Sequence, residues 1–146
     1  MRIIFVRYGE YDNGHINQSG RETMLSIAHR LESYIANHKV NIVVADVPRA
    51  IESADILCKE LHLPKAQPFK ELFAEEENGR LPDIETAASV VFSAAKQKDT
   101  LIVIASREYL ELLPKYILNG ENSVKTEIKR GEMLIVDYEL RNVSYL

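Results

Sequence analysis

Short apolar runs alternate along this chain with longer segments in which apolar residues recur every three or four positions. A short, continuous apolar run is typical of a strand buried on both faces of a sheet, and the longer spacing is typical of a helix with one buried face. Their alternation predicts an α/β protein, a three-layer α/β/α sandwich with a mostly parallel central sheet. The strand candidates are 3–6, 42–45 and 101–105, and the helix candidates are 19–38, 49–61 and 83–94.

Capping and turn residues mark the boundaries of these segments. Ser19 and Glu22 form the pattern of a capping box, so the first long helix is expected to be capped by Ser19. Asp83 or Pro82 is expected to open the third helix. The segment 9–14 contains two glycines and an asparagine, which predicts a loop.

The remaining segments carry weaker signals. Pro114 is expected to kink or stop the helix in which it lies. Two prolines bracket a connection over 64–68. The apolar run 133–136 follows Gly131 and predicts a hairpin-like end, to which 143–146 adds an edge strand.

Composition narrows the class of protein. The 146 residues fit one domain, 1–146, and the net charge of −4 without a basic block argues against a nucleic-acid partner. No apolar run approaches the ~20 residues that cross a bilayer, and the N-terminal apolar stretch is too short for a signal peptide, so we expect a cytoplasmic protein with no membrane partner. No cluster has metal-ligand spacing and no glycine-rich phosphate loop is present, so neither a metal nor another cofactor is expected.

Arginines follow the three strand candidates. Arg7, Arg49 and Arg107 come at or shortly after the carboxyl ends of these strands, where ligands collect in open α/β sheets. Three converging guanidiniums would suit a phosphate group, because the planar fork of arginine binds such oxyanions bidentately. The alternative is that each arginine is a surface charge paired with a nearby carboxylate, for which the candidates are Glu10, Asp46, Glu75 and Glu108.

Five short segments resemble the motifs of the histidine phosphatase superfamily in the right order. Arg7-Tyr8-Gly9-Glu10 resembles the opening Arg-His-Gly-Glu motif, and residues 16–20 resemble the Leu-Thr-x-x-Gly segment of the first helix. Residues 49–54 resemble Arg-Ala-x-x-Thr-Ala, Glu75 with Gly79 resembles Glu-x-x-x-Gly, and 101–107 resembles the strand that ends in Ser-His-Gly. The resemblance implies a phosphoglycerate mutase-like fold, and the short chain is most similar to the small phosphohistidine phosphatase branch.

The same resemblance implies that both catalytic histidines are replaced. Tyr8 stands at the nucleophile position, Arg107 at the position of the second histidine, and Glu75 at that of the acid. A phenol is neutral near pH 7 and is a much weaker nucleophile than imidazole, whereas arginine retains positive charge toward a phosphate. We therefore expect an inactive or severely impaired phosphatase that retains a phosphate-binding pocket formed by Arg7, Arg49 and Arg107. The ligand would be a phosphate-bearing small molecule or a phosphorylated protein segment.

Three alternatives remain open at this stage. The protein is an active phosphohistidine or phosphomonoester phosphatase if Tyr8 or His15, which lies in the loop after the first motif, replaces the nucleophile. Arg107 fills the pocket instead if it pairs with Glu75 or Glu10, since an unpaired buried charge is costly. The chain is an interaction domain if the pocket is only a remnant.

Overall fold

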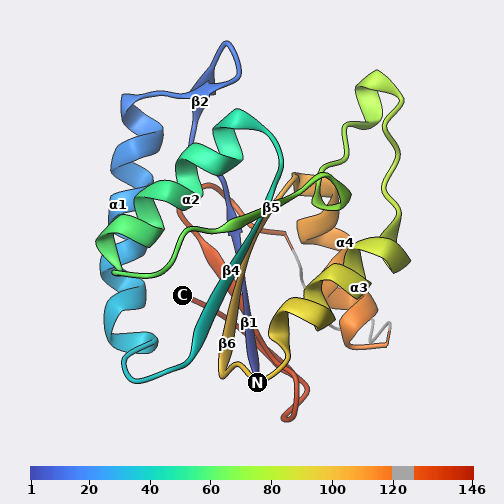
Figure 1. Cartoon of the computed structure of the whole chain (residues 1–146). Coiled ribbons are helices and arrows are strands. Elements are labelled where there is room, and N and C mark those ends of the chain that lie inside the picture. Colours follow the sequence, from blue (N-terminus) through green and yellow to red (C-terminus); the bar gives the residue numbers. More distant parts are fainter. Residues whose placement is uncertain (120–126) are drawn as a thin grey trace.

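The computed structural model describes residues 1–119 and 127–146, and its centre is a six-stranded sheet (Figure 1). In spatial order the strands are β5, β4, β6, β1, β7 and β8. The first four run parallel, β7 is antiparallel to β1, and β8 is antiparallel to β7. The strands span Arg2–Arg7 (β1), Val40–Ala45 (β4), Gln67–Phe69 (β5), Thr100–Ala105 (β6), Met133–Asp137 (β7) and Asn142–Tyr145 (β8).

Helices cover both faces of this sheet, which confirms the predicted α/β/α sandwich (Figure 1). α1 and α2 pack together on one face, and α3 and α4 pack together on the other. The helices span Gln18–Tyr34 (α1), Pro48–Glu60 (α2), Ile84–Ala95 (α3) and Arg107–Ile117 (α4). No helix in the described ranges combines the length and the apolar character needed to cross a membrane.

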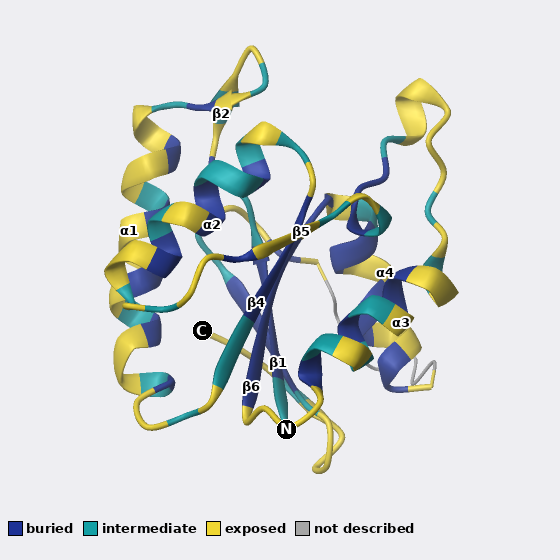
Figure 2. Ribbon diagram, viewed as in Figure 1, coloured by how far each residue is buried: buried dark blue, intermediate teal, exposed yellow. Residues whose placement is uncertain are grey.

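The central strands form the core, as Figure 2 shows by their dark colour. Residues 3–6 of β1 and 101–105 of β6 are completely inaccessible to solvent. Both strands lie in the middle of the sheet with helices above and below, so their apolar side chains are buried whichever face they point to. This explains why the sequence shows continuous apolar runs here rather than alternation.

The first helix begins before the expected capping box. Asn17, not Ser19, is the N-cap, and its side-chain oxygen accepts a hydrogen bond from the Gly20 N–H at 2.9 Å. Ser19 lies inside the helix, where its carbonyl accepts from the Thr23 hydroxyl. The prediction of a Ser19 cap is therefore wrong by two residues, because the Asn17 side chain satisfies a free N–H group of the first helical turn, that of Gly20.

The segment after β1 is a small hairpin rather than an irregular loop. Two short antiparallel strands, β2 (Tyr11–Asp12) and β3 (His15–Ile16), are joined by Asn13 and Gly14. Both turn residues have positive φ, 51° and 82°. An Asn-Gly pair with two left-handed residues is the favoured connection of a two-residue hairpin, so the turn signal was in the sequence although the strands are very short.

The structure differs from the prediction at Pro114 and over 64–68, and it agrees with the prediction at the start of α3 and at the C-terminal hairpin. α4 continues through Pro114 to Ile117 because buried Leu113 and Ile117 pack its last turn on the core, and the expected early stop is wrong. The 64–68 connection leads into the edge strand β5, which tolerates a proline because one side of an edge strand needs no ladder donor. Asp83 caps α3 as expected, and β7 and β8 form the predicted antiparallel end.

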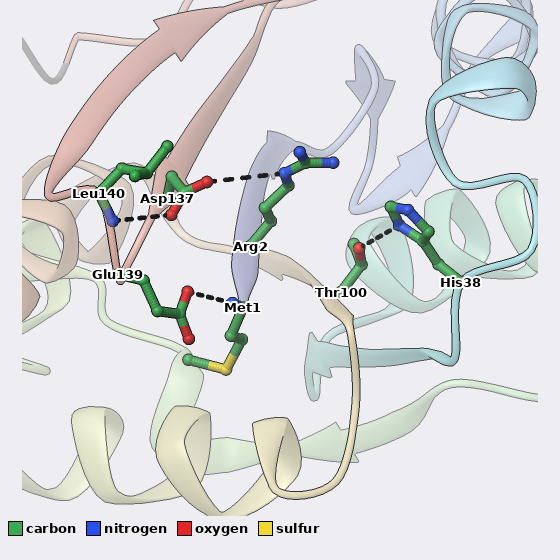
Figure 3. A network of polar contacts seen from close by, with 7 residues as sticks. All are labelled: Met1, Arg2, His38, Thr100, Asp137, Glu139 and Leu140. Atoms are coloured by element: carbon green, nitrogen blue, oxygen red, sulfur yellow. Dashed lines mark hydrogen bonds and ion pairs between the residues drawn. The ribbon is translucent and has the colours of Figure 1, made fainter.

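A polar network closes the end of the sheet at which β1 and β6 begin (Figure 3). It joins the start of β1 to the β7–β8 hairpin and joins the segment after α1 to the start of β6. Functional sites of such sheets lie at the opposite, carboxyl end, so this network has a role in holding the fold. Its contacts are those of the Met1 ammonium with Glu139, Arg2 with Asp137, His38 with Thr100, and Asp137 with the Leu140 N–H.

Candidate functional site

Two glycines bring the carboxyl end of β1 against the start of α1. A Cβ atom on Gly9 would lie 2.7 Å from the carbonyl oxygen of Gly20, and one on Gly20 would lie 2.2 Å from the carbonyl oxygen of Glu10. Both separations are shorter than any side chain tolerates against backbone. The motif glycines at 9 and 20 are therefore required by close backbone packing, which fixes the path of the chain just after Tyr8.

A buried serine connects the same loop to α2. The Ser53 side chain is completely inaccessible to solvent, and its hydroxyl accepts a hydrogen bond from the Gly9 N–H at 3.0 Å. The same hydroxyl donates to the carbonyl oxygen of Arg49 at 2.8 Å. This hydroxyl therefore holds the loop that carries Tyr8 beside the helix turn that carries Arg49.

A second buried serine joins the segment 72–75 to the start of α4. The Ser106 hydroxyl accepts a hydrogen bond from the Ala74 N–H at 3.0 Å, and the Ser106 N–H donates to the carbonyl of Leu72 at 3.4 Å. Ser106 precedes Arg107, and Ala74 precedes Glu75. The segments that carry Glu75 and Arg107 are thereby held together at the same edge of the sheet.

Aromatic rings surround the Arg49 guanidinium. Its Cζ atom lies 5.2 Å from the ring centroid of Tyr8, 4.6 Å from that of Tyr11 and 5.5 Å from that of Phe73. These distances are those of cation–π contacts, which hold a guanidinium without neutralising it. The Arg49 Nε–H is buried and has no hydrogen-bond partner among the described residues. Burial alone would lower the pKa of Arg49, but the Tyr8 hydroxyl, Tyr11 and the Glu75 carboxylate raise it above its ordinary value.

Arg7 directly precedes Tyr8 in the chain, and its side chain is half-buried. Its Nη1 donates to the carbonyl oxygen of Ile128 at 3.3 Å. Burial lowers the pKa of Arg7, and the positive charges of Arg130 and Arg107 lower it further. Arginine remains protonated despite such a shift. Arg7, Arg107 and Arg130 therefore form a concentrated positive region.

The structure also places the other predicted residues. Arg107 is exposed and its ion pair is with Glu111, 3.9 Å away on the same helix. The pairing of Arg107 with Glu75 or Glu10, which would have filled the site, does not occur among the described residues. The ring of His15 contacts Glu52 on α2 at 3.2 Å.

Nothing in the sequence singles out Arg130 and Tyr11. Arg130 follows no strand, and it lies near Arg7 because β7, which begins three residues later, starts beside Val6 at the carboxyl end of β1. Tyr11 belongs to the hairpin that the sequence predicted as a loop. Within the described ranges no group of three or more histidine, cysteine and acidic side chains is placed to hold a metal ion.

Positive charge at this edge is left largely unpaired. No carboxylate lies within ion-pair distance of Arg7, Arg49 or Arg130 in the described part of the chain. Like charges that share a partly desolvated region repel one another more than they would in water. The arrangement is therefore suited to receive an anion.

The sequence matches no family model, and no curated protein matches it significantly. Solved structures do match over nearly the whole chain. The protein histidine phosphatase SixA complexed with tungstate superposes with a TM-score of 0.77 at 15% identity, covering 100% of this chain and 94% of that one. A mycobacterial glucosyl-3-phosphoglycerate phosphatase complexed with VO3 gives 0.69 at 11% identity, covering 99% and 96%.

A phosphoglycerate mutase from Plasmodium falciparum gives a TM-score of 0.68 at 21% identity, covering 99% of this chain and 87% of that one. These proteins differ in the reactions their names describe, but each superposes on nearly the whole of this chain. The chain therefore has the phosphoglycerate mutase-like fold that the histidine phosphatases share.

Proposed function

We propose that this chain binds a phosphate-bearing small molecule or a phosphorylated protein segment and hydrolyses it poorly or not at all. The binding residues are Arg7, Arg49 and Arg107. The observation that carries the proposal concerns Arg7, the residue before Tyr8, and Arg49, whose Cζ atom lies 5.2 Å from the Tyr8 ring centroid. Neither has an ion-paired carboxylate among the described residues. Guanidiniums that have no carboxylate partner can each direct N–H groups at one phosphate.

The comparisons support an oxyanion as the ligand. Two structures of the same fold are complexes with tungstate and with VO3, both of which contain a metal bonded to oxygen. Tungstate is tetrahedral and doubly negative, as a phosphate dianion is. At 15% and 11% identity these structures share the fold of this chain, and what they support is the class of ligand.

Poor turnover follows from the residue at position 8. Transfer of a phosphoryl group to the protein needs a nucleophile that is not protonated near pH 7, which imidazole provides and a phenol does not. The Tyr8 ring also packs edge-on against Tyr11, with centroids 5.7 Å apart, and faces the Arg49 guanidinium. Tyr8 thus occupies space beside the guanidiniums. The ring of His15 contacts Glu52 on α2, and a His15→Ala variant tests whether this histidine acts as a nucleophile.

Binding is tested by titrating inorganic phosphate and tungstate into the purified chain and measuring affinity by calorimetry. A charge-assisted hydrogen bond contributes about 1.5–3 kcal/mol, so Arg49→Ala is expected to weaken binding about tenfold or more. Arg49→Lys keeps the charge but loses the fork, and we expect it to bind weakly as well. Lys96→Ala, an exposed change at the far end of α3, removes one positive charge and should leave the affinity unchanged. Equal affinities for all four proteins would contradict the proposal.

Impaired turnover is tested with a generic aryl phosphate. The unmodified chain should show little or no hydrolysis, and the double change Tyr8→His with Arg107→His should raise it. Rapid hydrolysis by the unmodified chain, lost in Tyr8→Phe or His15→Ala, would instead establish an active phosphatase with an unusual nucleophile.

A further inference from the structure

Arg130 extends the arginine cluster beyond the three positions that the motifs indicate. Its Cζ atom lies 5.7 Å from the ring centroid of Tyr11. The Cζ atom of Arg49 lies 4.6 Å from the same centroid. One phenol ring therefore contacts two guanidiniums that come from distant parts of the sequence.

A closed turn holds Arg130 in this place. The Glu132 N–H donates to the carbonyl of Lys129 at 3.0 Å, and the Glu132 carboxylate accepts from the Lys129 N–H at 3.1 Å. The guanidinium of Arg30 on α1 donates to the carbonyl of Gly131, which has a positive φ of 86°. Arg130 thus projects from a turn that is tied to α1.

The charges at this edge exceed what one phosphate neutralises. Arg7, Arg49, Arg107 and Arg130 together carry four positive charges. Among the residues that the structure describes, one carboxylate lies within ion-pair distance of any of them: that of half-exposed Glu111, 3.9 Å from Arg107. A phosphate monoester carries about −1.5 to −2 charges near pH 7. One such group, together with the Glu111 carboxylate, would leave about one positive charge unpaired in the cluster.

We propose that Arg130 forms a second anionic subsite beside the first, and that the ligand carries a diphosphate, a phosphoryl group linked to another phosphoryl group. This inference rests on the proposed function, because the first phosphoryl group occupies the site formed by Arg7, Arg49 and Arg107. The second group lies toward Tyr11 and Arg130 and neutralises the remaining charge.

The experiment compares inorganic phosphate with inorganic diphosphate at fixed ionic strength, with affinity measured by calorimetry. We expect the unmodified chain to bind diphosphate at least tenfold more tightly than phosphate. Arg130→Gln should weaken diphosphate binding about tenfold, the loss of about one charge-assisted contact, and should change phosphate binding by less than about twofold. Arg130 is exposed, so the variant is expected to fold normally.

Lys129→Gln is the matched control. It removes the same charge from the neighbouring exposed position, and its side chain makes no contact with Tyr11 in the structure. The control should bind both anions as the unmodified chain does.

Equal loss of diphosphate affinity in Arg130→Gln and Lys129→Gln would overturn the subsite, because it would mean that a general positive field attracts the anion. Equal affinity of the unmodified chain for phosphate and diphosphate would also overturn it while leaving the proposed function intact. Failure of both anions to bind would overturn the proposed function and, with it, this inference.

Discussion

Replacing Ser53 by alanine tests the connection on which the site depends. The Ser53 hydroxyl is the acceptor for the buried Gly9 N–H at 3.0 Å, and the side chain is completely inaccessible to solvent. Ser53→Ala leaves that N–H without a partner, at a cost of about 1–3 kcal/mol. The better helix propensity of alanine offsets about 0.5 kcal/mol. The free energy of unfolding should therefore fall by roughly 0.5–2.5 kcal/mol.

This change is large enough to measure by urea unfolding and by thermal melting. For a chain of about 150 residues each kcal/mol shifts the melting temperature by about 2–4 °C, so we expect a decrease of roughly 1–10 °C. Ser89→Ala is the matched control, because Ser89 is an exposed residue within α3. The control should stay within about 0.5 kcal/mol of the unmodified chain. If Ser53→Ala unfolds with a free energy equal to or higher than that of the unmodified chain, the Ser53 hydroxyl does not stabilise the fold in the way proposed.

Three further predictions concern separate parts of the molecule. Gly20→Ala should destabilise the protein by about 1–3 kcal/mol although alanine favours helices, because its Cβ would lie 2.2 Å from the Glu10 carbonyl; a stabilised variant in urea unfolding would contradict this packing. Hydrogen bonds from Thr86 hold the pKa of Asp83 below its ordinary value, so the stability that the ionised cap contributes is present above about pH 4 and is lost as pH falls through the lowered pKa. The difference in unfolding free energy between the unmodified chain and Asp83→Ala should therefore shrink below pH 4, and a constant difference would argue against it. Burial raises the pKa of the Cys58 thiol, so it should react slowly with a thiol reagent at pH 8 until denaturant is added; rapid labelling of the folded chain would show that the thiol is accessible.

The strands and their arginines were predictable because their signals are local. The runs at 3–6 and 101–105 are apolar at every position, which only a strand covered on both faces requires. Arg7 and Arg107 then follow from the rule that ligands collect at the carboxyl ends of parallel strands. Gly9 and Gly20 were recognisable as well, because they lie in segments that resemble family motifs. That resemblance does not explain why glycine is needed at these two positions.

Contacts between residues that are distant in sequence depend on the tertiary structure. Gly9 and Gly20 are glycines because two backbones touch, and the Ser53 hydroxyl matters because Gly9 lies 3.0 Å away. Similarly, Arg130 faces Tyr11 only because the chain returns beside β1 after α4. Local periodicity contains no information on such pairings, since the energy of a contact depends on residues that are distant in sequence. Local sequence patterns were enough to predict the layers of the fold and the strand ends at which Arg7 and Arg107 lie, whereas the contacts of Arg49 and Arg130 with Tyr11 depend on the three-dimensional fold.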